Sequence, residues 1–256
     1  MFFADFLDRT VETFGRHPAL IEGKTICNFE EMAYFVHDIA LKIEKYRLPR
    51  GSHIGILMKN NPSQVLILLG IILSGHVAVI YNHSQPKERL QEQIDLLDIA
   101  KIVLEDTSFI LSGMMDRYCL AKDIVSWGSP PVSHPQISRQ KSHVRRNNEP
   151  AIIIFTSGSS GIAKAVVHSY ENLRYSALGS NQAVLFQPGD HWLVTLPFFH
   201  VSGLALIWRT LCGGGVLVFP DCSESLAWNI SHHKPTHISL VSSQLYALRT
   251  RSQESE

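Results

Sequence analysis

The chain has 256 residues, of which 45% are hydrophobic and 18% are charged, and its formal net charge is zero. This composition is typical of a globular protein of one or two domains and argues against general disorder. The absence of net positive charge argues against non-specific binding to nucleic acid or to an anionic membrane surface.

The cysteines and the apolar segments favour the cytoplasm. The four cysteines are scattered and form no Cys-x-x-Cys pair, so reduced thiols are expected. The first apolar residues are interrupted by acidic ones and follow helical spacing, unlike a signal peptide. The run 65–80 includes Gly75 and His76 and is shorter than the roughly 20 residues that cross a bilayer. A buried helix followed by a buried strand is expected there.

Helix-like and strand-like segments alternate through the first part of the chain. Amphipathic or capped segments predict helices at residues 3–14, 29–46 and 86–97 and from Pro62 onward. Short apolar runs predict buried strands at residues 53–58, 77–80 and 101–104. This alternation predicts an α/β fold with mainly parallel sheets flanked by helices.

Residues 126–150 have a different character: they include Pro130, Pro131 and Pro135, several serines, and the basic residues Lys141, Arg145 and Arg146. This segment is predicted to be a linker or surface loop between a first α/β subdomain, residues 1–125, and a second, residues 151–256. Its basic side chains are read as solvated, with phosphate binding as the alternative.

The pattern sharpens after residue 150. The apolar run Ala151–Phe155 predicts a buried strand, and residues 165–168 predict a second one. Ser169 is predicted to cap a helix that extends to about Val184. A short helix is predicted over 203–211, before a run of three glycines. Further strands are predicted at residues 192–196, 216–219 and 237–241.

A Ser/Gly-rich loop follows the strand at 151–155, with the sequence Thr156-Ser157-Gly158-Ser159-Ser160-Gly161-Ile162-Ala163-Lys164. Its glycines let backbone amides approach an anion, its hydroxyls donate hydrogen bonds, and its lysine supplies a mobile positive charge. The spacing differs from that of a Walker A loop and of a hydrolase Gly-x-Ser-x-Gly turn. The loop is therefore predicted to hold a polyphosphate, with a flexible connection as the alternative.

This string resembles the signature of the adenylate-forming superfamily, which includes acyl-CoA synthetases, luciferases and the adenylation domains of peptide synthetases. The resemblance implies that a carboxylate attacks the α-phosphate of ATP, and that a thiol, usually that of CoA, then displaces AMP. It also implies a set of groups that hold the β- and γ-phosphates, with Mg²⁺ sharing their charge. These groups are Thr156, Ser157, Gly158, Ser159, Ser160, Gly161 and Lys164.

A second motif, Leu196-Pro197-Phe198-Phe199-His200-Val201-Ser202-Gly203-Leu204, resembles the acyl-pocket motif of the same superfamily. The resemblance implies that His200 lies beside the acyl carboxylate and takes part in catalysis. The alternative is a core histidine at the end of a strand.

Four further strings are Lys164-Ala165-Val166-Val167-His168, His200-Val201-Ser202-Gly203, Ile207-Trp208-Arg209 and Leu240-Val241-Ser242-Ser243-Gln244-Leu245. Together they resemble the 2-succinylbenzoate–CoA ligases of menaquinone biosynthesis. The resemblance implies a small carboxylic acid, ATP and CoA as ligands. Ser202 and the backbone of Gly203 are candidates to line the acid pocket, and Arg209 to bind a second carboxylate. A surface salt bridge is the alternative for Arg209. Residues 242–244 either touch a ligand or begin a helix, and another aryl or fatty acid remains open as the substrate.

Later motifs of the superfamily are absent from this sequence. These are a Tyr-Gly-x-Thr-Glu motif that assists Mg²⁺, a Thr-Gly-Asp motif that binds the ribose, and the lysine of a small C-terminal domain. The expectation is the N-terminal part of a ligase, as a fragment or as one half of a split enzyme that a second chain completes. A non-catalytic nucleotide- or acyl-binding module is the alternative, and a homodimer stays open because no helix shows heptads.

No protein metal site is predicted, since the spacing of His232, His233 and His237 with Cys222 matches no familiar zinc motif.

Overall fold

The computed structural model describes residues 3–110, 115–129, 148–157 and 163–253. The α-helices are α1 (Phe3–Phe14), α2 (Phe29–Glu44), α3 (Pro62–Leu73), α4 (Lys87–Leu96), α5 (Ala121–Ile124), α6 (Tyr170–Ala183), α7 (Val201–Gly213), α8 (Leu226–His233) and α9 (Ser242–Gln253). Two short 3-10 turns are η1 (Thr107–Phe109) and η2 (Met115–Arg117).

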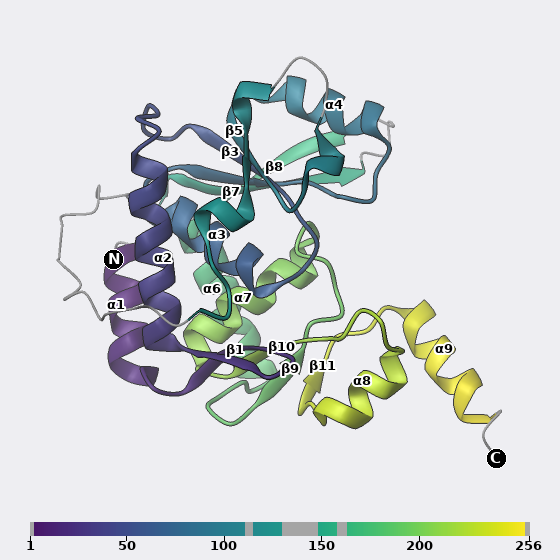
Figure 1. Ribbon diagram of the computed structural model, residues 1–256. Helices are drawn as coiled ribbons and strands as arrows, with labels where there is room; N and C mark the ends of the chain where they lie inside the picture. The colour runs from purple at the N-terminus through teal and green to yellow at the C-terminus, as the bar shows by residue number, and fades with distance from the viewer. Residues whose placement is uncertain (1–2, 111–114, 130–147, 158–162, 254–256) are drawn as a thin grey trace.

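The strands form two sheets with helices packed around them (Figure 1). They are β1 (Pro18–Glu22), β2 (Thr25–Asn28), β3 (His53–Leu57), β4 (Val77–Ile80), β5 (Ile99–Leu104), β6 (Tyr118–Leu120), β7 (Pro150–Ser157), β8 (Ala163–Ser169), β9 (His191–Leu193), β10 (Val216–Phe219) and β11 (His237–Ile238). This mixed, mainly parallel architecture confirms the predicted fold class.

The larger sheet has the order β6-β5-β3-β4-β7-β8 and is parallel except for the β7–β8 pair. Its parallel strands end at one edge, where the turn after β3, the turn after β4 and the Ser/Gly loop after β7 follow. In α/β sheets this edge is the usual place for a ligand.

The smaller sheet has the order β11-β9-β10-β1-β2. Its N-terminal strands, β1 and β2, form an antiparallel hairpin that turns through Gly23 in a left-handed conformation. Strand β1 also pairs in parallel with β10, and Leu20 lies opposite Leu217. Each sheet therefore combines strands from both sides of residues 126–150, and the predicted division at that segment does not separate the sheets. Most of the segment lies outside the described residues.

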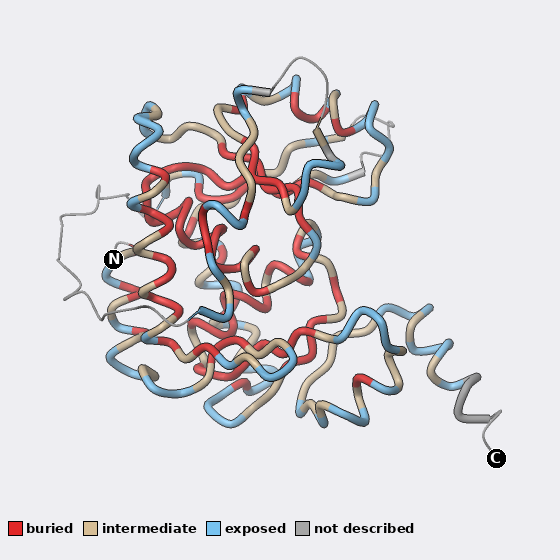
Figure 2. The backbone as a smooth tube through the Cα atoms, viewed as in Figure 1, coloured by how far each residue is buried: buried red, intermediate tan, exposed pale blue. Residues whose placement is uncertain are grey.

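Helix α3 lies in the core beside the sheets, and α2 packs on it with one buried face (Figure 2). Nearly every residue of α3 is buried, as expected for the apolar run that leads into β4. A Cβ at Gly70 would lie 2.4 Å from Cγ2 of Ile39, so this glycine allows α2 and α3 to pack closely. Within the described part of the chain, no helix has the length and apolar character that a membrane span requires.

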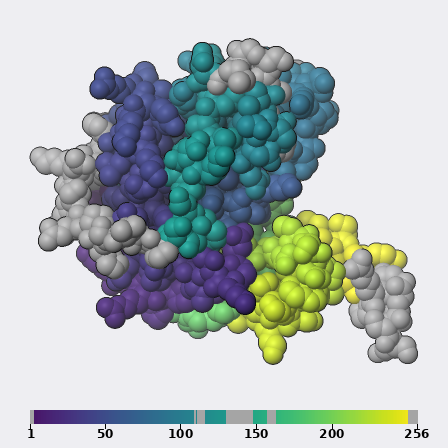
Figure 3. All heavy atoms as spheres, in the orientation of Figure 1, coloured from purple at the N-terminus to yellow at the C-terminus, as the bar shows by residue number. Residues whose placement is uncertain are grey.

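Several predicted boundaries differ from the structure. The strands predicted at 192–196 and 237–241 are shorter, because β9 ends at Leu193 and β11 at Ile238. Beyond β9 the Val194 amide still donates to the carbonyl oxygen of Val218, and Leu196 then accepts a hydrogen bond from Asn60 of the turn after β3. Ser169 caps α6 as predicted, and its hydroxyl accepts a hydrogen bond from the Asn172 amide. Helices α8 and α9 lie at one end of the molecule, where α9 projects from the body (Figures 1 and 3).

Candidate functional site

The predicted phosphate loop connects β7 and β8 at the edge of the larger sheet where the parallel strands end. Thr156 lies opposite Lys164 in the antiparallel register, and both side chains are exposed. Directly opposed residues share one face of a sheet, so the hydroxyl and the ammonium group stand together at the base of the loop. Gly158, Ser159, Ser160, Gly161 and the side chain of Ser157 lie outside the described residues, and their roles stay predictions.

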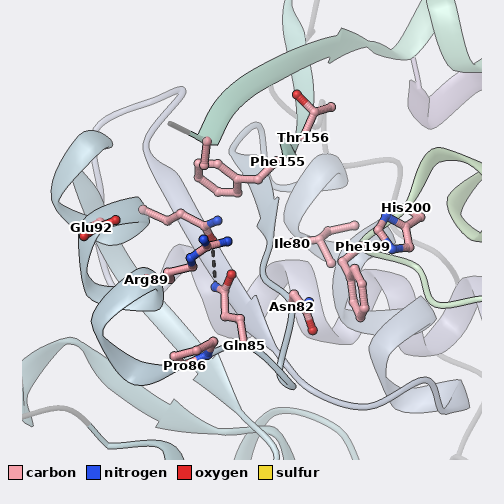
Figure 4. Close-up of a pocket in the computed structure, with 12 residues that line it drawn as sticks. Ile80, Asn82, Gln85, Pro86, Arg89, Glu92, Phe155, Thr156, Phe199 and His200 are labelled. Carbon is pink, nitrogen blue, oxygen red and sulfur yellow. Dashed lines mark hydrogen bonds between the residues drawn. The ribbon is translucent and has the colours of Figure 1, made fainter. Parts of the chain in front are cut away.

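A pocket of about 500 Å³ lies beside this base (Figure 4). Four segments form its wall: the end of β4 and the turn after it, helix α4, the two flanks of the Ser/Gly loop, and the loop before α7. The lining residues are Ile80, Asn82, Gln85, Pro86, Arg89, Glu92, Gln93, Phe155, Thr156, Ala163, Phe199 and His200. The structure thus brings the phosphate-loop motif and the acyl motif to one pocket.

The wall formed by α4 is polar, and no motif in the sequence predicted it. Gln93 is 8% exposed, and its Oε1 accepts a hydrogen bond from Nε2 of Gln85 at 2.8 Å. Arg89 and Glu92 are exposed at the same wall. Figure 4 shows Arg89 between Gln85 and Phe155. The only sequence signal was that the hydrophilic face of the predicted helix at 86–97 carries these residues.

Apolar rings form another part of the pocket. Phe155 stacks on the buried ring of Tyr81, with centroids 5.5 Å apart and an interplanar angle of 22°. On the far side, Phe199 packs edge-on against His83, with centroids 5.9 Å apart. These rings give the site flat hydrophobic surfaces between its polar ends, as an aromatic ligand requires.

His200 is the N-cap residue of α7 and its side chain is exposed toward the pocket. Its ring packs against Phe199, with centroids 4.6 Å apart, on the opposite side of the pocket from Gln85 and Arg89 (Figure 4). The alternative of a core histidine is therefore wrong. A role of His200 beside a carboxylate stays a prediction.

Ser202 and Gly203, the other candidates from the acyl motif, do not line this pocket. Ser202 is exposed in the first turn of α7, whereas Gly203 is buried. A Cβ on Gly203 would lie 2.3 Å from the carbonyl oxygen of Pro197 and 2.6 Å from that of Leu196. Close packing of α7 on the preceding loop therefore accounts for this glycine. Contacts of either residue with an acid stay predictions.

Arg209 is only 9% exposed, so the alternative of a surface salt bridge is wrong. Its Nη2 donates to the carbonyl oxygen of Val184 at 2.7 Å, and its Nε donates to Oδ1 of Asn181 at 3.3 Å. The guanidinium also lies over the ring of Trp192, 4.3 Å from the centroid. These contacts join α6, α7 and β9, and they use part of the hydrogen-bonding capacity of the Arg209 guanidinium. Its role toward a second carboxylate stays a prediction.

Residues 242–244 begin α9. The side chain of Gln244 accepts a hydrogen bond from the Val241 amide at 3.0 Å and donates to the carbonyl oxygen of Thr195 at 3.4 Å. These contacts correspond to the predicted helix start.

Comparison with known proteins supports the resemblance. A 2-succinylbenzoate–CoA ligase of Bacillus pumilus is 25% identical over 240 residues, which cover 92% of this chain and 48% of that protein. The Escherichia coli protein of the same name is 27% identical over 244 residues, covering 91% of this chain and 49% of that protein. The chain therefore spans about half the length of the curated relatives it matches.

Solved structures share the fold. An o-succinylbenzoate CoA synthetase of Bacillus subtilis, in complex with its acyl-adenylate intermediate, aligns with a TM-score of 0.82 at 20% identity and covers 96% of this chain and 64% of that one. The same enzyme with ATP and magnesium ion gives a TM-score of 0.79 at 21% identity, covering 95% and 65%. The N-terminal subdomain of Klebsiella oxytoca NpsA, in complex with 3-hydroxybenzoyl-AMSN, gives a TM-score of 0.75 at 21% identity and covers 92% of this chain and 59% of that one. The fold is that of the N-terminal part of the adenylate-forming enzymes.

A sequence model described as "AMP-binding enzyme" matches residues 7–256, and the chain belongs to that family.

Proposed function

We propose that this chain binds the phosphates of ATP and the acyl group in an AMP-forming acid–CoA ligase whose acid is 2-succinylbenzoate. The observation that carries the proposal is the shared pocket of Thr156 and His200, which come from two motifs far apart in the sequence. A ligand in this pocket touches the base of the phosphate loop at one point and the acyl motif at another.

The proposed reaction has two steps. A carboxylate oxygen of the acid attacks the α-phosphorus of ATP, the bond to the β-phosphate breaks, and pyrophosphate leaves. The sulfur of CoA then attacks the acyl carbon, and AMP leaves. The hydroxyl of Thr156 and the ammonium of Lys164 suit a polyphosphate, since both are exposed on one face at the loop base. Mg²⁺ bound to ATP would share the same charge.

The pocket is consistent with an aromatic acid. Its volume of about 500 Å³ lies within the usual range for small-molecule sites. Phe155 and Phe199 offer flat apolar surfaces, and Arg89 offers a cation that a second carboxylate could approach. The names of the curated relatives support 2-succinylbenzoate in particular. Another aryl acid is the second candidate, because the structurally similar NpsA subdomain holds a hydroxybenzoyl compound.

The phosphate assignment is tested by binding of MgATP to the Lys164→Ala variant, measured by calorimetry. Loss of a charge-assisted contact should weaken binding by about tenfold or more. Lys122→Ala is the matched control, because Lys122 is an exposed lysine of α5 outside the pocket lining. Equal affinities of Lys164→Ala and wild type for MgATP would contradict the assignment.

The substrate assignment is tested by pyrophosphate release from ATP with 2-succinylbenzoate. The assay uses the chain alone and the chain mixed with a polypeptide that carries the Tyr-Gly-x-Thr-Glu and Thr-Gly-Asp motifs. Turnover that requires the second polypeptide would support a split ligase. Turnover with medium-chain fatty acids but not with 2-succinylbenzoate would overturn the substrate. Binding of ATP or acid without turnover in either mixture would favour the non-catalytic module.

A further inference from the structure

Asn60 lies in the turn between β3 and α3, and its side chain contacts a loop of the other sheet. Its Nδ2 donates to the carbonyl oxygen of Leu196 at 2.8 Å, and its Oδ1 accepts from the amide of Phe198 at 3.0 Å. One amide thus binds the carbonyl and the N–H of residues two apart, as the backbone of a neighbouring strand would.

The turn that carries Asn60 is itself held in place. Glu105, which follows β5, accepts hydrogen bonds from the Lys59 amide at 3.1 Å and from Nδ2 of Asn61 at 3.3 Å. Oδ1 of Asn61 caps α3 by accepting from the amide of Gln64 at 2.9 Å. Asn60 therefore projects from a turn that is attached to both β5 and α3.

The loop that Asn60 contacts leads directly to the pocket. Phe198 is 1% exposed and packs edge-on against Phe219, with centroids 6.2 Å apart. The next two residues, Phe199 and His200, line the pocket. Within the described residues, the hydrogen bonds that reach residues 196–199 from another element are the two from Asn60.

We propose that Asn60 is a positioning residue, whose amide holds the loop before α7 so that Phe199 and His200 form a ready-made wall of the acid site. This inference rests on the proposed function of the pocket. Without the amide, the carbonyl of Leu196 and the N–H of Phe198 lose their partners and the loop gains alternative conformations. An incoming acid must then order the loop on binding, which weakens its affinity.

The effect should be selective for the acid. Thr156 and Lys164 stand on β7 and β8, to which Asn60 makes no hydrogen bond in the described part of the chain. Affinity for MgATP should therefore depend little on Asn60. Asn172 is the matched control, because it is an asparagine whose side chain binds Ser169 at the start of α6 and does not line the pocket.

The experiment measures binding of 2-succinylbenzoate and of MgATP to the full chain and to three variants, together with hydrogen exchange of the Phe198 amide. For Asn60→Ala we expect acid affinity to fall by about five- to tenfold, exchange to accelerate by a similar factor, and MgATP affinity to stay within about twofold. Asn60→Asp keeps the acceptor for Phe198 and loses the donor to Leu196, so it should be intermediate. Asn172→Ala should lower the melting temperature and leave acid affinity unchanged.

Two results would overturn the inference. One is unchanged acid affinity in a folded Asn60→Ala variant. The other is an equal loss of acid and MgATP affinity in Asn60→Ala and Asn172→Ala, which would indicate a general structural effect. If the wild-type chain binds no acid, the proposed function fails, and exchange of the Phe198 amide still decides the positioning contact. Accelerated exchange in Asn60→Ala alone then supports that contact, and unchanged exchange rejects it.

Discussion

At the scale of single residues, the acyl motif combines side chains that face the pocket with others that are determined by packing. His200 lines the pocket, whereas Gly203 is buried against the carbonyls of Pro197 and Leu196. A match to the motif does not tell pocket residues from packing residues, because the motif contains both kinds. The packing distances make the distinction.

Replacement of Gly203 by alanine should destabilise the protein by about 1–3 kcal/mol, because the added Cβ overlaps backbone atoms that have little room to move. Gly179→Ala is the matched control, since Gly179 lies in α6 with no atom within 4 Å of the added Cβ. That change should stabilise the protein by about 0.5–1 kcal/mol through helix propensity. Urea unfolding of both variants checks the prediction, which is wrong if the two changes have the same sign.

At the scale of elements, local signals predicted most helices and buried strands. Apolar runs marked β3, β4, β7 and β10, and an N-cap residue marked α6. The predictions were less accurate where pairing partners decide the element. The β1–β2 hairpin was not predicted, and β9 ends at Leu193 although the predicted strand continued to Leu196, which instead accepts a hydrogen bond from Asn60.

The start of α6 offers a test at this scale. The Ser169 hydroxyl accepts from the Asn172 amide at 3.2 Å, and the Ser169 amide donates to Oδ1 of Asn172 at 3.1 Å. Ser169→Ala should lower the free energy of unfolding by about 1 kcal/mol, because it removes the cap. Ser169→Asp should restore most of this loss, since aspartate caps well and suits the helix N-terminus. Equal stability of the alanine and aspartate variants would show that the cap contributes little.

At the scale of the whole molecule, several partly buried imidazoles link stability to pH. Burial lowers the pKa of His37, His83 and His168 below the ordinary value of about 6.5, with Lys59 adding to the effect at His83. Below that value the unfolded chain binds more protons at these positions than the folded protein does. The free energy of unfolding should therefore fall as the pH decreases through about 6.5.

Urea unfolding between pH 8 and pH 5.5 measures this dependence. Burial raises the pKa of the Glu22 carboxyl, which opposes the trend at the acidic end. A comparison of wild type with His168→Gln at each pH isolates one imidazole, because the variant lacks that titrating group. The slope with pH should be smaller in the variant, and identical slopes would exclude His168 as a contributor.

A homodimer, or completion of the site by a second chain, stays a prediction. The cytoplasmic location stays a prediction as well. The structure describes one chain and leaves the linker role of residues 126–150 a prediction as well.

The sequence by itself determined the fold class, the starts of several helices and the family, because caps, apolar runs and the string from Thr156 to Lys164 are local patterns. Only the tertiary structure decided that β1 pairs with β10, that α4 forms a wall of the pocket, and that Asn60 binds the loop before His200. These contacts join residues far apart in the chain. Such contacts depend on which strands become neighbours and in what register they pair. The hydrophobic periodicity of a single sequence carries no signal for the choice of neighbour or for the register.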